Sequence, residues 1–300
     1  MKVSCLVLFL LISSTAAVAP DTSDHAAASP IVQSDTKLDL INAARLGNMD
    51  AVKAALSRGD DINQRGQHGV DALIMAMKHY EKEIATYLVD QGVGFTVVDD
   101  HGRNSLLWAI WRQYVDIAEI LIKKGADVNV QNPDDGKTPL IYVSMHPHMR
   151  EHHHLIHMLV DAGADVNVID KNDHTALFLS AMNGHGDCVE ALLEHGAFVD
   201  HKQTFNGHTS LHAAAENGHS DVVEALLEHG ADVSLVATDN GRTALELAQR
   251  NGRRKIVKMI KKKNHWSCGH ASGIVKESEN KDQRWEEVSY MSIQVMCAVH

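Results

Sequence analysis

Aromatic residues and proline are both scarce in this chain. Phe, Trp and Tyr together make up 5% of its 300 residues, and there are five prolines. The few aromatics argue against a β-sandwich, and the few prolines argue against long proline-rich linkers. With 44% hydrophobic and 22% charged residues, the composition is that of a globular chain and favours helix.

Positive charge is also scarce, since 28 Lys and Arg stand against 39 Asp and Glu, for a net charge of -11. We therefore expect no nucleic-acid partner, because phosphate binding needs concentrated cationic side chains. The run from Arg253 to Lys263 is an exception. We interpret it as a solvated last helix whose cations complement the helix dipole, with an anionic membrane or nucleic acid as the alternative.

Long apolar runs are absent beyond the first residues, which indicate a secretory signal peptide. Lys2 precedes an apolar stretch over residues 6–12, and Ala17-Val-Ala19 follows as a small-x-small cleavage pattern. The stretch is shorter than the roughly 20 residues of a membrane span. We expect residues 1–19 to be removed, residues 20–37 to be disordered, and the protein to be secreted or lumenal, including periplasmic, with no membrane span in the mature chain.

Cysteine is scarce too, with four residues, of which Cys5 would leave with the signal. Cys188 is predicted to be a buried thiol on the core side of a helix. Cys268 and Cys297 are the candidate disulfide pair, although both could equally stay reduced or reach another chain.

A repeated pattern organises most of the chain. A Thr, Asn or Asp is followed two residues later by a leucine, at Leu73, Leu106, Leu140, Leu177, Leu211 and Leu245, with spacings of 33, 34, 37, 34 and 34 residues. A second mark, the glycine after a helix, recurs with it at Gly59, Gly92, Gly125, Gly163, Gly196 and Gly230. Two marks with one period predict a stack of similar units.

The segments Gly136-Lys-Thr-Pro-Leu140, Gly207-His-Thr-Ser-Leu-His212 and Gly230-Ala-Asp-Val233 resemble the ankyrin repeat. The resemblance covers residues 38–263 as seven units, at about 38–67, 68–100, 101–134, 135–170, 171–205, 206–239 and 240–263. It implies an all-α repeat solenoid, built from helix-turn-helix units joined by β-turn loops, with a concave face that binds a protein. It implies neither catalysis nor a cofactor. Residues 264–300 break the period and are predicted to form a flexible tail.

One unit illustrates the expected physics. Thr209 is placed to cap the first helix, Leu211 and two alanines to face a neighbouring unit, and Gly218 to permit the turn between helices. The second and third units depart from this pattern. Tyr80 and Gln113 occupy the glycine place, where a left-handed conformation would cost about 1 kcal/mol, so we expect these two loops to rearrange.

The fourth unit is longer and rich in histidine. Pro147 is expected to stop its first helix, and a second helix beginning near His152 would put His153 and His157 on one face. Such a spacing could bind zinc or copper, but no Cys, Asp or Glu completes a recognised ligand set. His152, His153, His154 and His157 are therefore weak metal candidates, and a solvated surface that titrates with pH is the favoured interpretation.

No nucleophile elbow, phosphate loop or zinc-protease motif occurs, so we expect no enzyme. The partner-binding positions are those that vary between units on the expected concave face. They are Lys78, His79, His101, Arg103, Trp111, Arg112, Lys137, Met145, Met182, Asn183, Phe205, His208, Glu216, Asn217 and Arg242. Trp111 and Arg112 stand out because Trp and Arg dominate binding hot spots. The alternative hypothesis is a metal- or pH-responsive binder that uses the histidine-rich loop.

Overall fold

The computed structural model describes residues 38–66, 69–146 and 153–271. These ranges are helical apart from loops and two isolated antiparallel bridges, Val98 with Asn104 and Val236 with Thr243. The helices are α2 (Leu40–Arg45), α3 (Met49–Ser57), α4 (Ala72–Lys78), α5 (Lys82–Asp90), α6 (Ser105–Trp111), α7 (Val115–Lys123), α8 (Pro139–Met145), α9 (His154–Asp161), α10 (Ala176–Asn183), α11 (Gly186–Glu194), α12 (Ser210–Asn217), α13 (Ser220–Glu228), α14 (Ala244–Arg250) and α15 (Arg254–Ala271).

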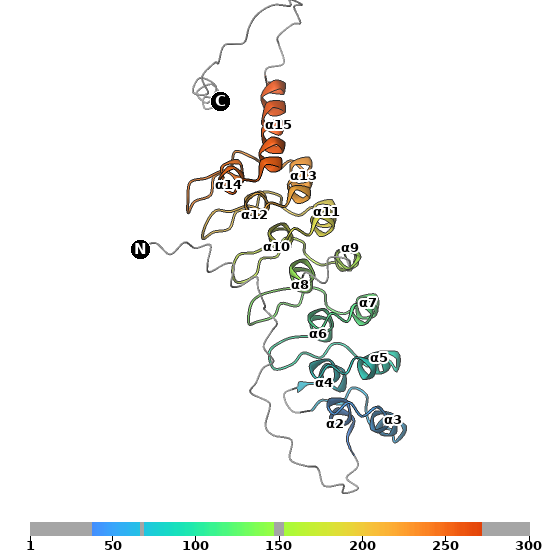
Figure 1. Ribbon diagram of the computed structural model, residues 1–300. Coiled ribbons are helices and arrows are strands. Elements are labelled where there is room, and N and C mark those ends of the chain that lie inside the picture. The colour runs from blue at the N-terminus through green and yellow to red at the C-terminus, as the bar shows by residue number, and fades with distance from the viewer. Residues whose placement is uncertain (1–37, 67–68, 147–152, 272–300) are drawn as a thin grey trace, which may run out of the picture.

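Consecutive helices pair into units that stack in one direction (Figure 1). The first helices of the units, which we call the inner helices, pack on one another from α2 to α14, and the second, or outer, helices form a parallel column. The loops that join one unit to the next project as turn tips on the side of the inner helices (Figure 1). The repeat stack predicted from the sequence is thus confirmed.

The core lies between the two columns and between neighbouring units. In the sixth unit Leu211, Ala214 and Ala215 are fully buried on α12, and Val222 and Leu226 on α13 complete the layer. Small alanines let the inner helices approach closely, whereas the branched side chains of the outer helices supply most of the buried apolar area.

Inner helices begin at a polar N-cap. Asp71 accepts a hydrogen bond from the Ile74 backbone N–H at 2.7 Å, and Asn104 accepts one from that of Leu107 at 2.9 Å. The degenerate units therefore keep the capping that threonine provides elsewhere. Thr209 caps α12 as predicted, in a reciprocal capping box with His212, a partner that the sequence analysis did not identify.

The prediction that the loops rearrange at Tyr80 and Gln113 is wrong. Their φ angles are 68° and 61°, in the left-handed region that Gly184 and Gly218 occupy at 73° and 94°. The reason is the hydrogen bonding at the end of the helix. The residue after the left-handed one donates to a carbonyl in the helix, from Glu81 to Ala76 at 2.8 Å for instance, and only a left-handed residue allows this bond.

The ends of the stack differ from its middle. Asp39 caps α2 and accepts from both the backbone and the side chain of Asn42, which gives the first unit a polar end. At the other end α15 continues to Ala271, so the first part of the segment predicted as a flexible tail is helical. None of the described helices is long and apolar enough to cross a membrane. The expected signal peptide and residues 20–37 lie outside the described residues.

The fourth unit has the long inter-helix connection predicted from its sequence. Helix α8 ends at Met145 and α9 begins at His154, two residues later than expected. Pro147 and His152 lie outside the described residues.

Candidate protein-binding face

One position of the inner helices changes character along the stack. Five residues after the repeated leucine, the third, fourth and fifth units carry Trp111, Met145 and Met182, each partly exposed and packed against the core. We call these three residues the apolar strip. The same position is Lys78 in the second unit and Glu216 in the sixth, so charged residues flank the strip at both ends.

Aromatic rings and guanidinium groups are stacked at the start of this strip. Trp111 packs on Trp108 with ring centroids 5.2 Å apart, and the Arg103 guanidinium lies 4.6 Å from the Trp108 ring and 5.3 Å from the Trp111 ring. Arg112 stacks on Tyr80 at 3.8 Å. Trp108 is buried, and its Nε1 donates a hydrogen bond to Asp99. The stacking holds Trp111 in place while leaving part of its surface accessible.

Three of the predicted partner contacts lie beside carboxylates of the turn tips. Arg103 Nε is 2.9 Å from Asp99, Lys137 Nζ is 2.9 Å from Asp135, and His208 Nε2 is 3.4 Å from Asp239. Their side chains are 12%, 13% and 10% exposed. These three side chains are therefore held against carboxylates of the tips, and little of their surface is left for a partner.

Three more predicted contacts tie one unit to the one before it. Arg112 donates to the Met77 and Lys78 carbonyls at 3.0 and 2.7 Å. Asn183 donates to the Met145 carbonyl and Asn217 to that of Met182, each at 3.2 Å. In the third, fifth and sixth units, the residue six positions after the repeated leucine thus links its unit to the preceding one. These links could not be predicted from the sequence because the bonded residues are more than thirty positions apart.

Several predicted residues are available on the surface. His79, His101 and Phe205 are exposed, and Phe205 remains 59% exposed at the tip that joins the fifth unit to the sixth. Arg242 is partly exposed at the last tip. Phe198, which is not among the predicted contacts, is 66% exposed and replaces the aspartate of the Gly-Ala-Asp-Val mark. A phenylalanine at this aspartate position is the feature of the sequence that could have predicted an exposed aromatic residue here.

The histidines of the fourth unit lie on the outer column. His157 Nδ1 is 2.9 Å from Nε2 of His195, His153 packs edge-on against His157, and His154 Nε2 is 3.0 Å from Glu119. The hydrogen bond from His154 lowers the pKa of Glu119. Across the described ranges no group of three or more His, Cys, Asp or Glu converges as a metal site would require.

Cys188 is a buried thiol on α11, as predicted. Cys268 lies within α15, whereas Cys297 is outside the described residues, so their pairing stays a prediction.

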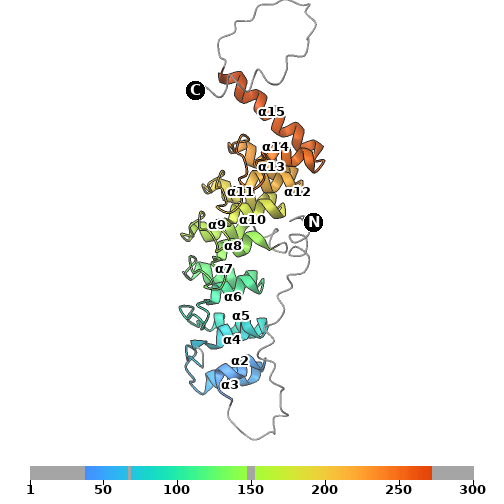
Figure 2. The same ribbon diagram turned by 90° about the vertical axis from the view of Figure 1, so that its left-hand side faces the viewer.

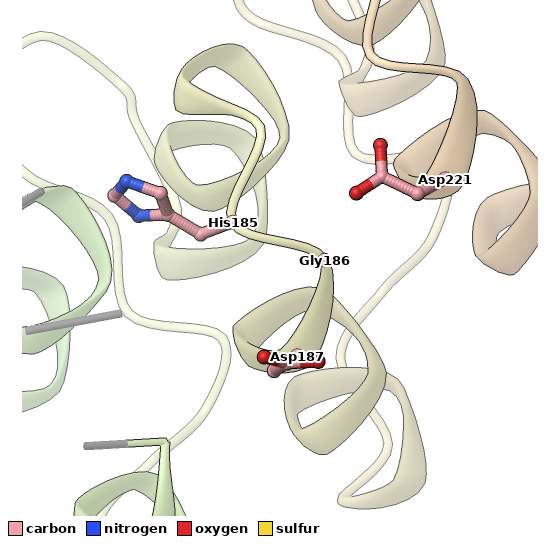
Figure 3. A pocket seen from close by; sticks show the side chains of 4 residues that line it. All are labelled: His185, Gly186, Asp187 and Asp221. Atoms are coloured by element: carbon pink, nitrogen blue, oxygen red, sulfur yellow. The ribbon is translucent and has the colours of Figure 1, made fainter. Parts of the chain in front are cut away.

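A small polar pocket of about 70 Å³ lies where α11 and α13 begin, lined by His185, Gly186, Asp187 and Asp221 (Figure 3). The His185 ring points away from the two carboxylates in this view, and its Nδ1 lies 3.0 Å from the Ser144 carbonyl. His185 thus ties the fifth unit to the fourth, and the pocket offers no convergent set of catalytic groups.

The family model of ankyrin repeats matches this chain three times, over residues 40–132, 128–203 and 197–268. The chain belongs to the ankyrin-repeat family. Ankyrin domains typically bind proteins and are usually non-catalytic, and the inner helices and turn tips line their concave face. This inner face therefore corresponds to the concave face predicted from the sequence.

The ankyrin stack is also similar to several known proteins. Mouse Rabankyrin-5 is 30% identical over 171 residues, covering 53% of this chain and 14% of that protein. A Caenorhabditis elegans ankyrin repeat and KH domain-containing protein, mask-1, is 28% identical over 52% of this chain and 6% of its own length. The chain thus spans a small part of these relatives. The ankyrin repeat domain of human ASB11 matches 73% of this chain and 96% of that domain, at 25% identity and a TM-score of 0.57.

Proposed function

We propose that this ankyrin-repeat chain is a non-catalytic module that holds an apolar segment of a protein partner against its inner face. The apolar strip supports this proposal. Trp111, Met145 and Met182 occupy a position that is charged in the units on either side, and the repeat framework does not require apolar residues there.

The three side chains suit recognition for different reasons. Trp111 is held by stacked guanidinium groups, so little conformational entropy is lost when it contacts a partner. Met145 and Met182 are flexible and can adapt to the shape of an apolar side chain. Lys78 and Glu216 at opposite ends give the face an electrostatic polarity, which would orient the bound segment.

The test is partner capture by immobilised protein, followed by affinity measurement on the captured partner. Trp111→Ala should weaken binding by about 2 kcal/mol, roughly thirtyfold, without loss of the helical circular-dichroism signal. Met145→Glu with Met182→Glu should weaken it further, because the apolar segment would meet two charges. Met158→Glu, a change from a partly exposed methionine to glutamate on the outer helix α9, is the matched control and should retain the partner. Unchanged affinity of the folded strip variants would contradict the proposal.

We also propose that the protein enters the secretory route or a periplasm, on the strength of the tripartite pattern in residues 1–19. N-terminal sequencing of the protein released from expressing cells should then begin near Pro20. A chain that keeps Met1 and stays inside the cell would contradict it.

A second candidate function, pH-dependent binding, rests on the contact between His157 and His195. The hydrogen bond between their rings needs one donor and one acceptor nitrogen, and two protonated imidazoles offer donors alone. Partner affinity measured at pH 7.5 and 5.5 should change in the parent and not in the double variant His157→Gln, His195→Gln. Calorimetric titration with zinc tests the metal version, and no heat at micromolar zinc would contradict that version.

A further inference from the structure

The last helix reverses the charge of the outer column. Helices α11 and α13 carry exposed acidic residues at equivalent positions, namely Asp187, Glu190, Glu194, Asp221, Glu224 and Glu228. At the same positions α15 carries Lys255, Lys258 and Lys262, joined by Arg254 and Lys261. We call these five exposed cations the basic stripe.

The basic stripe lies along one side of α15. Its members are spaced i, i+1, i+4, i+7 and i+8, which puts them within about a third of the helix circumference over roughly 12 Å of its axis. Figure 2 shows α15 at the end of the stack, reaching beyond α13 and α14. A linear ligand that follows the helix axis could therefore meet all five charges.

None of the five cations forms an ion pair with another described residue; Lys255 hydrogen-bonds the Ser220 hydroxyl at 3.1 Å. Arg254 with Lys258 and Lys258 with Lys262 are like charges four residues apart, a spacing that weakens a helix. Helix α15 thus carries repulsion that an anionic ligand would relieve.

The opposite side of α15 excludes insertion into a bilayer. Ile256 is 1% exposed and Ile260 is 0% exposed, because both pack on the stack. An interfacial helix must turn its apolar face to the lipid, and here that face is occupied. The acidic residues Glu224 and Glu228 on the neighbouring α13 would also be pressed against any broad anionic surface, a membrane or a DNA duplex alike. The stripe therefore suits a narrow, single anionic chain.

We propose that the basic stripe binds a sulfated polysaccharide lying along α15. Sulfate groups are ionised across the physiological pH range, they recur along a narrow chain, and such polymers are found outside cells. The choice of this polyanion over others rests in part on the proposed secretion.

The experiment measures the affinity of the full mature chain for a heparin octasaccharide by calorimetry. The triple variant Lys258→Gln, Lys261→Gln, Lys262→Gln should bind at least about tenfold more weakly, since one cation near an anionic surface contributes roughly a fivefold factor. The triple change Lys258→Arg, Lys261→Arg, Lys262→Arg should keep the affinity, which separates charge from a structural role. Circular dichroism checks the fold of each variant.

The matched control is Lys82→Gln, Lys123→Gln, Lys124→Gln, which removes the same charge from exposed positions in the second and third units and should bind within about twofold of the parent. Equal loss in both glutamine variants, no loss in the first, or equal binding of a desulfated octasaccharide would overturn the proposal. So would binding of duplex DNA or phosphatidylserine vesicles as tight as that of heparin. The heparin assay uses purified protein, so its result is independent of the N-terminal sequencing that tests secretion. Trp111→Ala should leave the heparin affinity unchanged, which separates this proposal from the one for the inner face.

Discussion

The second and third repeats and the fifth and sixth repeats reach the same backbone with different residues. In the fifth and sixth, Gly184 and Gly218 adopt the left-handed conformation after the inner helix. Tyr80 and Gln113 adopt it in the second and third. The comparison shows that the bonds closing each helix, and not the residue type, determine the geometry of this turn.

The ties between units differ in the same way. His219 Nε2 lies 3.1 Å from the Met182 carbonyl, linking the sixth repeat to the fifth. Arg112 makes the corresponding link from the third repeat to the second, with two hydrogen bonds and a stacked tyrosine. In the third repeat a guanidinium therefore makes the tie that the Asn217 amide and the His219 imidazole make in the sixth, and it gathers cationic and aromatic groups on the inner face.

The largest expected difference between the two regions is their response to acid. His212 in the sixth repeat is buried at a position that is Ile74 or Leu107 in the degenerate repeats. Burial, with the nearby His208 charge, lowers the pKa of His212 from 6.5 to about 4. The folded chain holds this ring neutral, so its contribution is complete above pH 6.5 and is lost as the pH falls towards 4. That contribution is about 3 kcal/mol.

Urea unfolding at pH 7.5 and 4.5 measures this loss. His212→Leu, which copies the third repeat, should reduce the difference in unfolding free energy between the two pH values. An unchanged difference would assign the acid sensitivity to other groups.

Gly184→Ala, in the fifth repeat, should lower the free energy of unfolding by about 2 kcal/mol. A left-handed alanine costs about 1 kcal/mol, and its Cβ would overlap the His219 ring and displace the hydrogen bond to Met182, worth about as much again. Thermal or urea unfolding gives the cost. Gly230→Ala is the control, because Gly230 has a φ of 86° and nothing lies within 4 Å of the added carbon. Its free energy of unfolding should fall only by the cost of the left-handed alanine, about 1 kcal/mol.

Arg112→Lys tests whether the guanidinium replaces the histidine tie. Lysine keeps the charge but cannot form both hydrogen bonds and the planar stack on Tyr80, so we expect a loss of about 1.5 kcal/mol in unfolding free energy. Arg250→Lys, an exposed substitution on the last inner helix, should be neutral. Equal stability of the two variants would show that Arg112 does not tie the repeats.

Gln113→Gly should have the smallest effect and the opposite sign. It removes the strain of a left-handed glutamine and should raise the unfolding free energy by about 0.5–1 kcal/mol. Asp173→Gly makes the same exchange at a φ of 62°, but Asp173 accepts a hydrogen bond from the Thr204 backbone, so that variant should lose stability. A destabilised Gln113→Gly variant would show that the left-handed turn carries no strain.

Much of the repeat architecture could be predicted from the sequence. The period of the leucines and glycines located the units, and Thr209 and Gly218 were assigned their places because capping and left-handed turns depend on near neighbours in the chain. Trp111, Met145 and Met182 were among the positions predicted to vary on the concave face, but the stacked units were needed to show that these three form one apolar strip.

The sequence by itself determined the repeat, its register and the type of each element, because these follow from residues within one turn or one helix. Tertiary structure decided which variable side chains are free on the inner face. Arg103 and Lys137 form ion pairs at the tips, the His208 ring lies against Asp239, and Arg112 is bonded to the preceding repeat. Such contacts depend on how the tips fold and on how one repeat is placed against the next, and that placement is set by packing rather than by position along the chain.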